Sequence, residues 1–139
     1  MVEIAFPIEF VVDGVPASLQ AGARSRQAWM ARVRQASLSA LPEGHFASAV
    51  PLAVTLFVFS ELAGGPDLDN LLKPVLDALN RHIYLDDGQV ERILVQRFKP
   101  GLRYRFDRSP LLTIASVGPR PTLYIRVSDD VLEGFDVVR

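Results

Sequence analysis

The alternation of apolar and polar residues is most regular between residues 66 and 80. Apolar side chains recur there at three- and four-residue steps, the spacing of one buried helix face. They are Leu68, Leu71, Leu72, Val75, Leu76 and Leu79. Asp67 and Asp69 stand at the start of this pattern, where short polar side chains accept hydrogen bonds from first-turn amides. The pattern predicts a helix, in which Pro74 requires either a kink or a start near Asn70.

The rest of the pattern predicts a sheet and a second helix. Runs of β-branched and aromatic residues bounded by glycine and proline are typical of strands. Strands are expected at residues 2–13, 50–60, 90–99, 111–117 and 122–127, and the second helix at residues 24–41. Trp29 lies on the apolar face of that helix and is expected in the core, while Pro7 suggests an edge strand or a bulge. We therefore expect an α+β fold, with a mixed β-sheet and two main helices.

Length and composition limit the class of protein. With 139 residues, 49% of them hydrophobic, the chain is expected to form a single domain over residues 1–139, with a tail after about residue 128 that frays or covers a neighbouring surface. The absence of cysteine excludes disulfides and thiolate zinc sites. No apolar run approaches the roughly 20 residues of a membrane span, and the N-terminal segment lacks the basic region of a signal peptide. We expect a cytoplasmic protein that does not contact a membrane.

Charged residues are unevenly distributed although the formal net charge is only −1. Residues 61–87 hold six acids against two basic residues, and residues 97–126 hold seven basic residues against one acid. Between residues 14 and 42 there are four arginines and no acid. An acidic centre with basic flanks suits a metal site beside a polyanion, and ordinary solvated surface is the alternative.

The segment 100–110 alternates basic and aromatic residues, with Arg103 and Arg105 beside Tyr104 and Phe106. Such segments suit backbone phosphates and unstacked bases. A surface hairpin or a dimer contact would explain the same residues, so the sequence leaves both interpretations open.

Two acidic pairs flank the predicted helix. Asp67 and Asp69 stand at its start, and Asp86 and Asp87 follow it in an Asp-Gly turn. If the next strand runs back alongside the helix, the second pair could face the helix start and complete an oxygen cage. Magnesium takes few carboxylates, several waters and a phosphate oxygen, and it can polarise a phosphoryl oxygen and activate a bound water. The pattern is therefore consistent with a metal-dependent phosphodiester hydrolase.

Lys73 lies one turn after Asp69 and could offset negative charge in the transition state at the scissile phosphate. The structural alternative is a salt-bridged helix face, worth a few tenths of a kcal/mol per pair. Its members would be Asp69, Lys73, Asp77 and Arg81, spaced four residues apart. On that interpretation Asp67 is only a helix cap, and the residues alone do not decide between the two.

Taken together, these residues resemble the RusA family of Holliday junction resolvases. The resemblance rests on the D-x-D-N-x-x-K pattern of Asp67–Lys73, on Asp77-Ala78-Leu79, and on the D-D-x-Q pattern of Asp86–Gln89. Arg97 stands where the family usually has a lysine at the end of the next strand. Some members carry arginines before the first aspartate, where this chain has Ala63-Gly64-Gly65-Pro66.

The resemblance implies a homodimeric, magnesium-dependent endonuclease, with manganese as a substitute ion, that cuts four-way (Holliday) DNA junctions in recombination and repair. It implies that Asp67, Asp69 and Asp87 are catalytic metal ligands and Lys73 the catalytic lysine. Whether Asp86 is a ligand stays open. The residues expected to contact DNA are Arg24, Arg26, Arg97, Lys99, Arg103 and Arg105. A dimer would place two sites on opposite strands, giving paired nicks.

Other functions are compatible with the same residues. A nuclease of the same chemistry could act on other branched DNA, or the chain could be a non-catalytic DNA-binding module. A purely structural dimer is a third alternative. The intact acidic set favours an enzyme, because carboxylates hinder simple phosphate binding.

Overall fold

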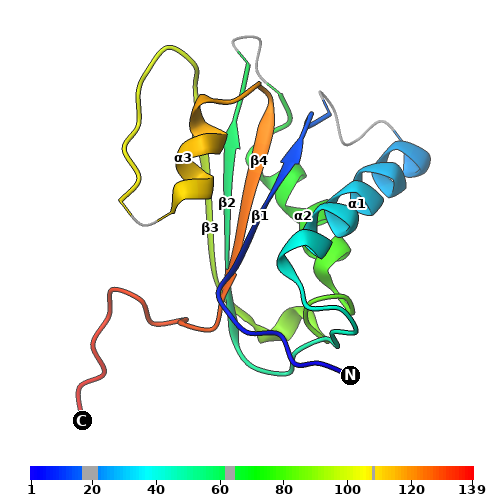
Figure 1. Ribbon diagram of the computed structural model, residues 1–139, viewed down its shortest axis with the longest axis vertical. Coiled ribbons are helices and arrows are strands. Elements are labelled where there is room, and N and C mark those ends of the chain that lie inside the picture. The colour runs from blue at the N-terminus through cyan, green and yellow to red at the C-terminus, as the bar shows by residue number, and fades with distance from the viewer. Residues whose placement is uncertain (17–21, 62–64, 108) are drawn as a thin grey trace.

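The computed structural model describes residues 1–16, 22–61, 65–107 and 109–139. Four strands form one sheet in the order β1-β4-β2-β3 (Figure 1). Their bounds are Ile8–Asp13 for β1, Leu52–Phe59 for β2, Val90–Phe98 for β3 and Thr122–Ser128 for β4. β4 pairs antiparallel with β1 and β2, whereas β2 and β3 are parallel. The predicted α+β class with a mixed sheet is confirmed, and β1 is an edge strand.

Helix α2 (Leu68–Leu79) connects the parallel strands β2 and β3. Parallel neighbours need a crossover, and a crossover helix runs back along the sheet, antiparallel to both strands. α2 therefore begins at the end of the sheet where β2 and β3 finish, and it ends near the start of β3 (Figure 1). The entrance of α2 and the turn that follows it consequently lie at opposite ends of the helix.

Helix α1 (Ala23–Ser37) lies beside α2 on the same face of the sheet (Figure 1). A short 3-10 turn, Leu38–Ala40, follows α1, so the predicted helix at 24–41 ends earlier than expected. Trp29 is 1% exposed and belongs to the core between the helices and the sheet, as predicted. Pro74 lies inside α2, so a start near Asn70 is wrong and the helix lacks the amide of residue 74.

The opposite face of the sheet carries a third helix, α3 (Pro110–Val117), where the sequence predicted a strand at 111–117. The Ser109 hydroxyl oxygen accepts a hydrogen bond from the Leu112 amide at 3.0 Å, and a proline occupies the first helical position. Leu112 packs against the sheet. The prediction is wrong because an apolar, β-branched run is typical of a strand, and the cap before it outweighs that pattern. The described residues thus contain three α-helices rather than two main ones.

The tail after β4 returns to the sheet. Arg92 Nη1 donates to the Glu133 carbonyl oxygen, and its guanidinium lies 5.5 Å from the centre of the Phe135 ring. Arg126 Nη1 lies 3.5 Å from Glu133 Oε2. The first part of the tail, up to Phe135, therefore contacts β3 and β4. No helix in the described residues is long and apolar enough to cross a membrane.

Candidate active site

The entrance of α2 presents two exposed carboxylates. Asp67 is the N-cap residue and Asp69 lies in the first turn. Asp67 forms no capping hydrogen bond within the described residues, so its carboxylate is not committed to closing the helix. The positive end of the helix dipole stabilises negative charge at both positions. At the end of β3, the Arg97 guanidinium donates to the carbonyl oxygen of Pro66, which fixes the chain just before Asp67.

A hollow of about 410 Å³ opens between α1 and the first turns of α2. Its lining consists of Gly22, Ala23, Arg26, Asp69, Asn70, Lys73 and Pro74. The structure therefore brings Asp69 and Lys73 together in one concave site, as the nuclease interpretation requires. It adds Arg26, which comes from the other helix and is distant in the sequence.

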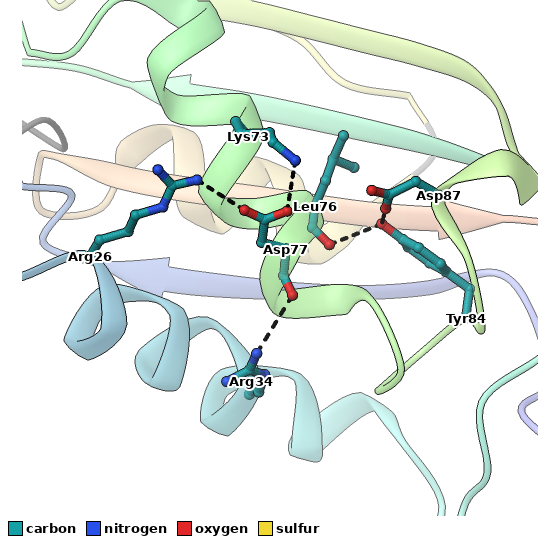
Figure 2. Close-up of polar contacts among 7 residues, drawn as sticks. All are labelled: Arg26, Arg34, Lys73, Leu76, Asp77, Tyr84 and Asp87. Atoms are coloured by element: carbon teal, nitrogen blue, oxygen red, sulfur yellow. Dashed lines mark hydrogen bonds and ion pairs between the residues drawn. The ribbon is translucent and has the colours of Figure 1, made fainter. Parts of the chain in front are cut away.

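Lys73 and Arg26 meet on the carboxylate of Asp77 (Figure 2). Lys73 Nζ lies 3.0 Å from Asp77 Oδ1, and Arg26 Nη2 lies 2.9 Å from Asp77 Oδ2. The Lys73–Asp77 pair is one pair of the ladder that the structural alternative predicted. That alternative does not remove Lys73 from the site, because the same side chain also lines the hollow.

Arg34, which belongs to α1, contacts the second half of α2. Its Nε donates to the carbonyl oxygen of Ala78 at 3.0 Å, and its Nη2 lies 3.5 Å from the carbonyl oxygen of Asp77 (Figure 2). A cation is favourable beside the last carbonyls of a helix. The two helices, and with them Arg26 and Lys73, are thereby held in a defined relative position.

The Asp86 carboxylate accepts a hydrogen bond within its own turn. Asp86 Oδ2 accepts from the Gly88 amide at 2.9 Å, and Gln89 Oε1 accepts from the Asp86 amide at 2.9 Å. This capping box starts the short 3-10 turn Asp87–Gln89. The Gln89 amide also donates to the Ser48 carbonyl oxygen at 2.7 Å. Asp86 therefore shapes the turn that presents Asp87.

Asp87 is held by Tyr84, a residue that the sequence analysis missed. The Tyr84 side chain is buried, and its hydroxyl lies 2.8 Å from Asp87 Oδ1 and 2.9 Å from the Leu76 carbonyl oxygen (Figure 2). Burial, and then the hydrogen bond to Asp87, raise the pKa of Tyr84 well above its ordinary value, so the hydroxyl remains a donor. A tyrosine three residues before an acidic turn is the only signal in the sequence that could have indicated this contact.

The structure separates Asp87 from the entrance of α2. Tyr84 and Leu76 hold Asp87 beside the second half of the helix, and among the described residues no three Asp, Glu, His or Cys side chains are close enough to share a metal ion. The sequence left open whether the second acidic pair faces the helix start, and within one chain Asp87 lies beside Leu76 instead. The crossover geometry is the reason, because the turn after α2 lies at the opposite end from its entrance.

The donor chemistry at the entrance nevertheless fits magnesium. Asp67 and Asp69 supply the hard oxygen ligands that this ion prefers, and magnesium usually takes only one or two carboxylates together with waters and phosphate oxygens. These two residues could therefore hold an ion without a third carboxylate from the same chain.

The basic residues expected to contact DNA occupy three different settings. Arg26 lines the hollow and Arg97 binds Pro66, whereas the remaining four are exposed. Those four are Arg24, Lys99, Arg103 and Arg105. Arg97 and Lys99 lie at the end of β3, which is the end of the sheet where α2 begins.

The aromatic residues of the 100–110 segment pack inward. The Tyr104 ring centre lies 4.7 Å from that of Phe98, and the Phe106 ring centre lies 5.6 Å from it. Arg103 and Arg105 alternate with these rings and are exposed. The segment therefore offers its arginines to solvent, and its aromatic side chains contribute to a small core rather than to an open stacking platform.

An acidic helix entrance with a lysine in the same hollow is the kind of site that nucleases use on phosphodiesters. Residues 22–104 match the family described as Endodeoxyribonuclease RusA, and this segment contains α1, β2, α2 and β3 with Asp67, Asp69, Lys73 and Asp87. The match covers more than half of the chain, and the chain belongs to the RusA endodeoxyribonuclease family. This confirms the resemblance found in the sequence. No curated protein matches the sequence at a significant level.

Proposed function

We propose that this protein is a magnesium-dependent endodeoxyribonuclease that resolves four-way DNA junctions by paired phosphodiester hydrolysis. The observation that carries the proposal is that Asp69 and Lys73 line one hollow, at an acidic helix entrance, inside the segment that matches the RusA family. Membership of an endodeoxyribonuclease family supports the cutting of DNA, and the junction substrate is the narrower part of the proposal.

Asp67 and Asp69 are the residues that would hold the ion, because both are exposed oxygen donors at the positive end of α2. When bound, magnesium, or manganese in its place, polarises the phosphoryl oxygen and activates water. Lys73 lines the same hollow, and in this proposal it stabilises negative charge that develops on the phosphate oxygens. Asp77 and Arg34 keep Lys73 and its helix in place.

We include a homodimer in the proposal, since two sites are needed to cut two strands symmetrically. The third carboxylate, Asp87, belongs to the proposed catalytic set, but in one chain it lies beside Leu76 rather than at the entrance of α2. A second copy of the chain could bring its own Asp87 to that entrance. The oligomeric state and the metal affinity should then change together.

The exposed cations that follow β3 supply the DNA surface in this proposal. Lys99, Arg103 and Arg105 follow β3 directly, close in sequence to the Arg97 that supports the helix entrance. Contacts of this kind bind phosphates without reading sequence, and they make affinity depend strongly on salt.

A cleavage panel tests the proposal. The purified protein is incubated with a synthetic four-way junction, a flapped duplex and a plain duplex of matched sequence, each with and without magnesium. We expect symmetric nicks in the junction, only with the ion. Equal or faster cutting of the flap would redirect the proposal to other branched DNA. Binding of the junction without cutting, in either magnesium or manganese, would support a non-catalytic DNA-binding module instead.

A further inference from the structure

Arg26 and Lys73 form a two-cation arrangement whose members come from two helices. Each binds a different oxygen of the Asp77 carboxylate, at 2.9 and 3.0 Å. Arg34 fixes the two helices to each other just beyond this point. Figure 2 shows both cations reaching the Asp77 carboxylate, one at each oxygen. The arrangement depends on a contact between residues 51 positions apart, so no local helix rule produces it.

We propose that the hollow between α1 and α2 is a subsite for one phosphate group of the DNA, that Arg26 is one of its ligands, and that Asp77 is the residue that positions Arg26 and Lys73 for it. The proposal rests on the proposed function for the nature of the ligand, since it takes DNA to be the polyanion that enters the hollow.

The cations keep donors for a ligand after they have bound Asp77. A guanidinium has five N–H donors and an ammonium has three, and Asp77 accepts one from each. Both side chains line the hollow, and Asp77 is not among the described residues that line it. The side chains are 37% exposed for Arg26 and 64% for Lys73, so a phosphate can reach them. Asp77 thus holds the cations from outside the hollow while their other donors remain accessible.

The charges around the hollow balance one another, so an anion should enter it only together with a cation. Asp69 lines the same hollow, and with Asp77 it balances the charges of Arg26 and Lys73. An ion held at the entrance of α2 would offset Asp69 and leave an excess of positive charge for the phosphate. Divalent ions should therefore strengthen DNA binding as well as permit cutting.

The ordinary alternative is that Asp77 forms a surface salt bridge with no role in binding, which is common for partly exposed pairs. The two explanations predict opposite changes in DNA affinity when the charge of Asp77 is removed. Removal of an acidic charge near a DNA surface strengthens binding when the charge only repels phosphate. Removal of a positioning residue weakens binding, because Arg26 and Lys73 must then be ordered by the DNA itself.

The experiment measures the affinity of the full chain for a synthetic four-way junction in the presence of calcium. Calcium binds oxygen ligands and is chosen to occupy the site at Asp67 and Asp69. Five proteins are compared: the wild type, Asp77→Asn, Arg26→Gln, the double variant of these two, and the charge-matched control Glu43→Gln. The Glu43 side chain is exposed in a turn and is not among the described residues that line the hollow. Thermal unfolding of each protein verifies that the fold is kept.

We expect Asp77→Asn to bind the junction about threefold to tenfold more weakly than the wild type, the loss expected when flexible side chains must be ordered on binding. Arg26→Gln should weaken binding by a similar or larger factor, and Glu43→Gln should leave it unchanged or slightly stronger. In the Arg26→Gln background, Asp77→Asn should have a clearly smaller effect, because part of its action passes through Arg26.

Tighter binding by Asp77→Asn, or an Arg26→Gln variant that binds like the wild type, would overturn the subsite, and so would a wild type that does not bind the junction. A wild type that binds in calcium with the expected variant effects, but never cuts in magnesium, would contradict the proposed nuclease and support the subsite. A wild type that cuts normally, together with an Asp77→Asn variant that binds more tightly, would support the proposed nuclease and contradict the subsite.

Discussion

Replacing Tyr84 with phenylalanine isolates the contact that holds Asp87. The change removes only the hydroxyl, which lies 2.8 Å from Asp87 Oδ1 and 2.9 Å from the Leu76 carbonyl oxygen. The Leu76 oxygen keeps the Asn80 amide as a donor at 3.0 Å, and the exposed Asp87 carboxylate can take water instead. We therefore expect a loss typical of a single hydrogen bond and below the range for bonds to charged groups, about 1 kcal/mol of unfolding free energy, or about 3–5 °C in Tm for a chain of this size.

The functional effect of Tyr84→Phe should be larger than its effect on stability. If Asp87 is a metal ligand, a partner that orients it contributes about tenfold or more to metal affinity or activity. Tyr124→Phe is the matched control, because Tyr124 is also buried and its hydroxyl donates to Glu9 Oε2 at 2.6 Å on the α3 side of the sheet. It should reduce Tm by a similar amount and leave both metal affinity and junction cutting unchanged.

A double-mutant cycle with Asp87→Ala provides the decisive readout. Chemical denaturation of the four proteins should give a coupling free energy of roughly 0.5–1.5 kcal/mol between Tyr84 and Asp87. The raised pKa of Tyr84 keeps its hydroxyl protonated, so the coupling should be the same at about pH 6 and about pH 9. A coupling of zero, or equal losses of cutting in Tyr84→Phe and Tyr124→Phe, would show that Tyr84 does not position Asp87 for function.

Three further predictions concern charge. Asp69→Asn should abolish cutting while it preserves or improves junction binding, because it removes both a metal ligand and a negative charge; loss of binding with the fold intact would contradict its role. Neutralising Arg103 and Arg105 together should reduce the slope of log affinity against log salt by up to about 1.8, and an unchanged slope would move the DNA surface elsewhere. Burial, with His45 and Arg34 nearby, lowers the pKa of His82 below 6.5. The unfolded state then binds the proton more readily, so unfolding free energy should fall as pH drops below about 6.5. His82→Asn should make that fall shallower, and an unaltered profile would exclude this group as its source.

Local signals in the sequence were sufficient for most of the elements. The three- and four-residue apolar spacing predicted α2, and β-branched runs predicted β2, β3 and β4 within a few residues. They failed at α3, where an apolar run of strand-forming residues follows the Ser109 cap. In that segment the hydrogen bond from the Leu112 amide to the Ser109 hydroxyl decides the local structure, since it caps the first turn of a helix.

The candidate site was harder to predict because its geometry depends on topology. The sequence places both acidic pairs next to α2, but only the direction of the crossover shows that they lie at opposite ends of the helix. The pairing of Arg26 with Asp77 joins two helices and has no local pattern. Tyr84 is apparent only once its hydroxyl is seen between α2 and the acidic turn.

The most direct test of the nuclease assignment is the cleavage of a synthetic four-way junction by the wild type and by Asp69→Asn, each with and without magnesium. We predict symmetric cuts by the wild type that require magnesium and that disappear in the variant, although the variant still binds the junction. Cutting by Asp69→Asn at the wild-type rate would contradict the acidic site at the entrance of α2. Binding without cutting by the wild type would contradict the nuclease itself.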